Sequence, residues 1–233
     1  MYQAFINNPN ELREYLVTLQ DEKFRSFHAK LVKSEKDIIL GIPIPKLRAI
    51  AKELVKYDCE KILTFPAVTF EEKAIKGFII GYSKYSMVKT ISCLRDFVSQ
   101  INNWAICDTT VSSLVIFKTH QAEGREFIAE CLATDSEFIV RYGLVLLLSH
   151  YMNNDYIDDI IDVCAHVKSE DYYINMALAW LISVCFVYYP QKAYPLFAGK
   201  LDKFVHNKSI SKIRESYRVI QDDKDKVFLL RIK

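Results

Sequence analysis

Glycine and proline are scarce in this sequence, with six of each among 233 residues. β-Sandwiches and barrels need many turns, and turns are rich in these two residues, so their scarcity favours an all-helical chain. The six cysteines are scattered, none of them forms a C-x-x-C pair, and several lie inside apolar runs, where cysteine behaves as a small hydrophobe. The sequence therefore indicates neither a disulfide framework nor a zinc site, and a reducing cytosol is expected.

Signals for membranes, metals and common catalytic motifs are missing as well. The amino terminus, "MYQAFINNPNELREYL", has no basic segment followed by an apolar core, so no signal peptide is expected. The longest apolar stretch, "MALAWLISVCFVYY", is too short to span a bilayer and predicts a buried helix. The five histidines lack metal-ligand spacing, and no H-E-x-x-H, Walker or G-x-S-x-G motif occurs. We expect a cytoplasmic protein with no metal, no cofactor and no membrane partner.

Helical periodicity is what the sequence does show, along almost its whole length. The segment "PIPKLRAIAKELVKY" places its apolar residues on one stripe, and Thr69 and Glu72 have the spacing of a capping box. About a dozen helices with short connections are predicted, and short connections make neighbours antiparallel. We therefore predict an all-α chain with a single domain over residues 1–233, an α-α superhelix of HEAT-like hairpins with a concave groove.

The charge is small overall but unevenly distributed. The net charge is +2, which is not the signature of a protein that binds nucleic acid over its whole surface. From residue 191 onward, however, there are 11 Lys and Arg against 5 Asp and Glu. This end of the chain could bind an anionic partner through its local field, although a solvated basic helix would show the same pattern.

Four residues stand out because they interrupt apolar helices. Trp104 and Asp108, in "NNWAICDTT", are four residues apart and so share a helix face. Arg141 is the only charge between Glu137 and His150, and must either pair with a carboxylate or face a groove. Trp180 lies in the middle of a very apolar helix. Structural roles are open for each: the tryptophans could fill the core, Asp108 could bond within its own turn, and Arg141 could pair with Asp108.

Five segments together resemble the AlkD-type DNA alkylation repair family, HEAT-like-repeat proteins that excise alkylated purines. They are "LGIPIPKLRAIAKEL" (40–54), "NNWAICDTT" (102–110), "FIVRYGLVLLL" (138–148), "YYINMALAWLISVCFVYYP" (172–190) and "NKSISKIRESYRV" (207–219). The resemblance runs nearly end to end. One departure is Ala105, which stands where better-known members have a second acid.

This resemblance implies a site and an activity. Asp108 corresponds to the family's catalytic aspartate, Trp104 and Trp180 to its groove tryptophans, and Arg141 to an arginine that holds a phosphate. The basic residues Lys208, Lys212, Arg214 and Arg218 would contact the DNA backbone. The expected activity is release of cationic bases such as 3-methyladenine and 7-methylguanine from duplex DNA, without drawing the base into a pocket.

Other functions fit the same helices. A HEAT-type protein could bind distorted or branched DNA without chemistry, or serve as a scaffold for another protein. The resemblance favours a monomeric glycosylase, associated with the nucleoid, whose partner is double-stranded DNA carrying alkylated bases.

Overall fold

The computed structural model describes residues 1–32 and 38–233, and every secondary-structure element in them is a helix. One isolated β-bridge joins Ile38 to Thr69. The helices are α1 (Tyr2–Asn7), α2 (Pro9–Thr18), α3 (Glu22–Val32), α4 (Ile44–Leu54), α5 (Glu60–Thr64), α6 (Phe70–Tyr82), α7 (Met87–Val98), α8 (Trp104–Val111), η1 (Val115–Lys118), α9 (Gln121–Leu132), α10 (Glu137–His150), α11 (Ile157–His166), α12 (Tyr172–Tyr188), α13 (Pro190–Ala193), η2 (Tyr194–Phe197), α14 (Lys203–Glu215) and α15 (Gln221–Phe228). The prediction of an all-helical chain is confirmed.

The chain forms two compact units, residues 1–125 and 126–233, and passes from one to the other within α9. A single domain over residues 1–233 stays a prediction, as do the superhelix and its concave groove. In the described part of the chain, no helix is both long enough and apolar enough to cross a membrane.

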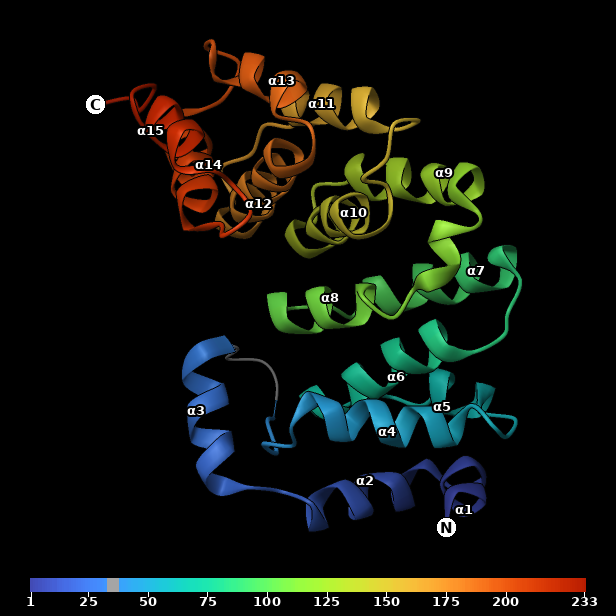
Figure 1. Ribbon diagram of the computed structural model, residues 1–233. Coiled ribbons are helices and arrows are strands. Elements are labelled where there is room, and N and C mark those ends of the chain that lie inside the picture. The colour runs from blue at the N-terminus through green and yellow to red at the C-terminus, as the bar shows by residue number, and fades with distance from the viewer. Residues whose placement is uncertain (33–37) are drawn as a thin grey trace. The chain divides into compact units, whose positions relative to one another are not determined.

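In the first unit, α4, α6 and α8 pack side by side in a row (Figure 1), and α5 and α7 pack against α6. The start signals in the sequence explain where these helices begin. The Asn8 side chain caps α2. Thr69 and Glu72 form the predicted capping box of α6, because the Thr69 side chain accepts from the Glu72 amide and the Glu72 carboxylate accepts from the Thr69 amide.

A buried carboxylate fixes the chain just before α4. Glu71 is fully buried, and its Oε1 accepts hydrogen bonds from the amides of Leu40, Gly41 and Ile42 at 3.1, 2.9 and 3.3 Å. Burial raises the pKa of Glu71, while these amides oppose the rise. Gly41 has a φ of 83°, which glycine adopts at little cost. The start of α4 is thus held against α6.

In the second unit, α12 packs between α10 and α14, and it also contacts α11 and α13 (Figure 1). The predicted buried helix "MALAWLISVCFVYY" lies within α12, where Ala177, Leu181 and Cys185 are fully buried. Burial of apolar residues on several faces fits a helix that is covered by neighbours on more than one side.

Candidate nucleic-acid interface

Helix α8 presents an indole and a carboxylate together. It begins at Trp104 because the Asn103 side chain accepts a hydrogen bond from the Ile106 amide at 3.0 Å. Trp104 and Asp108 are both half-exposed, whereas the residues between them are buried. The prediction that these two side chains share one face is confirmed, and that face is directed away from the core of the unit.

Two glycines allow α8 to pack closely on α6. A Cβ atom on Gly77 would overlap the Thr110 side chain, and one on Gly81 would overlap Ser113. Because Gly77 and Gly81 are one turn apart, they form a shallow strip on α6 that accepts the buried side of α8. The opposite side of α8, with Trp104 and Asp108, is thereby turned outward.

Arg48 of α4 holds the carboxyl end of α8. Its Nη2 donates to the Thr109 carbonyl oxygen and to Ser112 Oγ, each at 2.7 Å. Its Nη1 donates to the Tyr82 hydroxyl at 2.7 Å, and its guanidinium lies 4.4 Å from the Phe78 ring centroid. The sequence analysis missed Arg48, since nothing in its own segment shows that it reaches residues about 60 positions away.

The electrostatics of α8 make Asp108 unusual. A helix dipole disfavours a carboxylate in the second half of a helix, and Asp108 is the only charged residue of α8. The cationic Arg48, bonded to a carbonyl of the last turn, offsets part of that cost. The exposed face thus offers one negative charge beside a flat apolar ring, a combination suited to a cationic organic group.

In the second unit, a basic and aromatic cluster surrounds a cavity of about 270 Å³. We call it the Trp180 cluster: Trp180 and Tyr188 from α12, Lys212 from α14, and Arg218 from the segment that follows α14. Lys212 Nζ lies 6.0 Å from the Trp180 ring centroid. Aromatic rings combined with cations are typical of surfaces that bind nucleic-acid backbones and bases.

Arg218 is held in this cluster by Tyr188. Its Nη1 donates to the Tyr188 hydroxyl at 2.7 Å, and its guanidinium lies 5.8 Å from the Tyr188 ring centroid. Both side chains are exposed. Tyr188 was not among the predicted site residues, although it follows Trp180 by two helical turns and so lies on the same side of α12.

The other predicted backbone-binding residues divide between two places. Lys208 is half-exposed on α14, one turn before Lys212, so it extends the basic side of the Trp180 cluster. Arg214 lies elsewhere, with its guanidinium 4.2 Å from the Phe228 ring centroid of α15. The structure therefore brings Lys212 and Arg218 together with Trp180, and places Arg214 against a different helix.

Arg141 is buried between α10 and α12. It is 5% exposed, and its Nη1 donates to the Tyr173 carbonyl oxygen at 2.9 Å. The Tyr173 amide in turn donates to Glu137 Oε1 at 2.8 Å. Arg141 therefore ties α10 to the first turn of α12, and its role as a phosphate clamp stays a prediction that depends on the small part that remains exposed.

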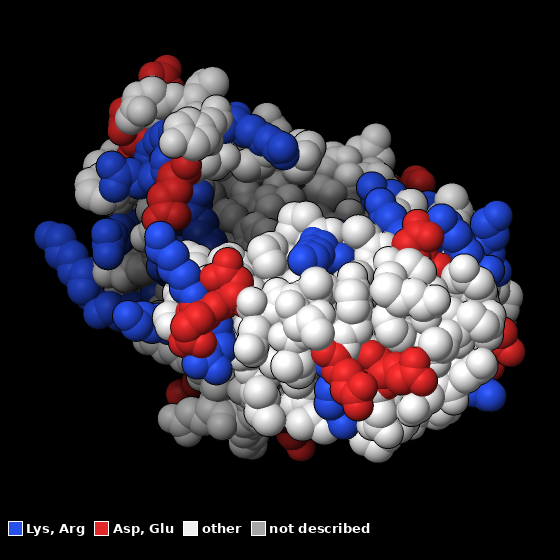
Figure 2. Space-filling view, turned by 90° about the horizontal axis from the view of Figure 1, so that it is seen from below, with Lys and Arg blue, Asp and Glu red and all other residues white. Residues whose placement is uncertain are grey.

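Charges of both signs mix over the surface. On the face that the amino-terminal helices form, Lys and Arg are interspersed with Asp and Glu (Figure 2). Binding of an anion must therefore come from local clusters rather than from a uniformly basic face. Within the described residues, His, Cys, Asp and Glu side chains form no group of three or more that could hold a metal ion.

A family model described as "DNA alkylation repair enzyme" matches residues 10–193. The match includes the residues of α8, α10 and α12 that the sequence analysis singled out, and it ends before α14. No curated protein matches the chain.

Proposed function

Because the chain belongs to the family of DNA alkylation repair enzymes, we propose that it is a DNA glycosylase that releases positively charged N-alkylpurines, such as 3-methyladenine and 7-methylguanine, from duplex DNA without base flipping. The observation that carries this proposal is the outward face of α8, where Trp104 and Asp108 are half-exposed among buried neighbours. A protein that used α8 only for packing would have no reason to place an indole and a carboxylate there.

The chemistry needs little more than a negative charge. An N-alkylated purine already carries a positive charge, so it departs as a neutral base and needs no general acid. The deoxyribose becomes cationic as the bond breaks, as in glycoside hydrolysis. A carboxylate about 4 Å from that charge stabilises it by about 4 kcal/mol at an effective dielectric constant of about 20. We assign this role to Asp108, together with positioning of the attacking water. No cofactor takes part.

The tryptophans act on the sugar and on the backbone beside the lesion. An indole face stabilises a nearby cation by about 0.5–2 kcal/mol. We assign such a contact to Trp104, because it shares its helix face with Asp108. Trp180 provides a second aromatic wall, in a cluster that also contains Lys212 and Arg218. These two cations bind phosphates, which gives affinity without reading the base sequence.

The substrate class is tested by comparing a cationic with a neutral lesion. The purified protein is incubated with duplex DNA that contains either 7-methylguanine or hypoxanthine, and the released base is measured by chromatography. We expect release of 7-methylguanine and no release of hypoxanthine, because a neutral purine needs protonation that Asp108 cannot supply. Equal release of both bases, or release of neither, would refute the proposal.

A second candidate is binding of damaged or branched DNA without chemistry. The Trp180 cluster favours it, because aromatic and basic groups there can bind a backbone whether or not Asp108 acts. The two functions separate in one experiment. A non-catalytic binder would retain methylated duplex, with an affinity that falls as salt rises, yet release no base after prolonged incubation.

A further inference from the structure

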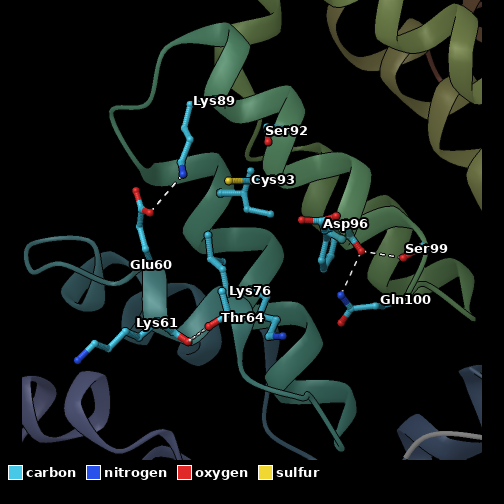
Figure 3. Close-up of a pocket in the computed structure, with 13 residues that line it drawn as sticks. Glu60, Lys61, Thr64, Lys76, Lys89, Ser92, Cys93, Asp96, Ser99 and Gln100 are labelled. Atoms are coloured by element: carbon cyan, nitrogen blue, oxygen red, sulfur yellow. Dashed lines mark hydrogen bonds and ion pairs between the residues drawn. The ribbon is translucent and has the colours of Figure 1, made fainter.

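A second polar cavity lies in the first unit, among α5, α6 and α7 (Figure 3). Its volume is about 610 Å³, within the range of sites that bind small molecules. Its charged lining residues are Glu60 and Lys61 of α5, Lys76 of α6, and Lys89 and Asp96 of α7. None of the residues proposed for DNA repair lines this cavity.

Lys76 is the unusual member of this lining. It is 5% exposed, in a helix whose described residues are almost all buried. Among the described residues it has no hydrogen bond and no carboxylate within ion-pair distance. Burial lowers the pKa of Lys76, and the charge of Glu72 opposes that shift. A buried ammonium without a close counter-charge is costly for a protein to maintain.

Glu72 is not available to pair with Lys76, although it lies one turn earlier on α6. Its Oε1 accepts from Arg13 Nε at 2.7 Å. Its Oε2 accepts from the amides of Val68 and Thr69 at 2.8 and 2.9 Å. Both carboxylate oxygens are therefore already engaged, and the positive charge of Lys76 remains to be balanced by something from outside the chain.

The remaining lining groups favour an anion. Lys89 pairs with Glu60 at 3.2 Å, which neutralises both charges. Lys61 is exposed at the edge, and only Asp96 opposes it and Lys76, so the lining is net positive. Ser92 adds a hydroxyl, and burial raises the pKa of Cys93, which keeps that thiol neutral.

We propose that this cavity binds a small solute through a phosphoryl group, with Lys76 as the buried counter-charge and Lys61 and Ser92 at the edge. A phosphoryl group carries enough charge for two lysines, and its three oxygens can accept from several donors at once. A single carboxylate would leave one of the two lysines without a partner. The inference is independent of the glycosylase proposal, because it uses different residues and a different cavity.

The test is a titration followed by amide chemical shifts, with inorganic phosphate and glycerol 3-phosphate as probes. In the wild type we expect saturable shifts at amides of α5, α6 and α7. Lys76→Met keeps the length of the side chain and should weaken this binding at least tenfold. Lys30→Met removes an exposed lysine of α3 and should leave it unchanged. Tighter binding of glycerol 3-phosphate would identify a phosphorylated solute, and equal binding would identify free phosphate.

Failure would be clear in either of two ways. Shifts that do not saturate at α5–α7, or that persist with the same affinity in Lys76→Met, would overturn the proposal. Lys61→Met provides a second variant at an exposed position, and we expect it to weaken binding several-fold even if Lys76→Met should fail to fold. Base release by Lys76→Met should equal that of the wild type, so this proposal and the glycosylase proposal fail separately.

Discussion

Arg48 Nη2 donates a hydrogen bond to the Thr109 carbonyl oxygen at 2.7 Å, which joins α4 to the residue directly after Asp108. The same guanidinium also bonds Ser112 and Tyr82 and lies over the Phe78 ring. One side chain thus determines where the last turn of α8 lies relative to α4 and α6. We infer that Arg48 is a positioning residue for Asp108.

The first prediction concerns Arg48→Met. Loss of hydrogen bonds from a charged donor should lower the free energy of unfolding by about 1–3 kcal/mol. That change corresponds to a fall in melting temperature of about 2–12 °C for a chain of this size. Single-turnover base release should slow while the affinity for methylated duplex changes little. Arg25→Met is the matched control, because Arg25 is exposed and bonds Glu22 on its own helix. If Arg25→Met slowed base release as much as Arg48→Met, the positioning role would be wrong.

The second prediction concerns the Trp180 cluster. Removing one phosphate-binding cation should reduce the slope of log affinity against log salt concentration by about one. Lys212→Met and Arg218→Met should each show this loss in duplex-binding titrations across a salt series. Lys200→Met serves as the control, since Lys200 is exposed and lies outside the cluster. Unchanged slopes in both cluster variants would argue against backbone binding there.

The third prediction concerns the pH dependence of stability. His28 is buried against Phe70, with ring centroids 4.6 Å apart, and burial lowers the pKa of His28 below 6.5. The folded state therefore binds a proton at this site less readily than the unfolded state. The stability contributed by neutral His28 is present above pH 6.5 and is lost as pH falls through the lower folded-state value.

Thermal unfolding between pH 7.5 and 5 measures this effect. The wild type should lose stability over that range, and His28→Leu should lose less of it. His166→Leu is a suitable control, because His166 is exposed on α11. Parallel pH profiles for the wild type and His28→Leu would show that His28 does not contribute.

Local features of the fold could be predicted from the sequence because neighbouring residues determine them. The capping box of Thr69 and Glu72 depends on residues three positions apart. The shared face of Trp104 and Asp108 follows from helical geometry alone once a helix is assumed. The all-helical class followed from the scarcity of turn-forming residues together with the periodicity of the apolar ones.

Long-range features could not be predicted in the same way. Arg48 reaches Thr109 across 61 residues, and no local pattern encodes that contact. Glu72 and Lys76 have the spacing of an exposed helical ion pair, yet α6 is buried and Glu72 binds Arg13 instead. Arg141 was correctly identified as a charge that needs a partner. The Tyr173 carbonyl oxygen that it binds became visible only with α12 packed against α10.

The most direct measurement is the single-turnover rate of 7-methylguanine release by Asp108→Asn. The substitution keeps the shape of the side chain and removes its charge, while Asp58→Asn makes the same change at an exposed position of the first unit. A stabilisation of about 4 kcal/mol corresponds to about a thousandfold in rate. We predict a loss of about a hundred- to a thousandfold for Asp108→Asn and a wild-type rate for Asp58→Asn. Base release by Asp108→Asn at the wild-type rate would contradict the account.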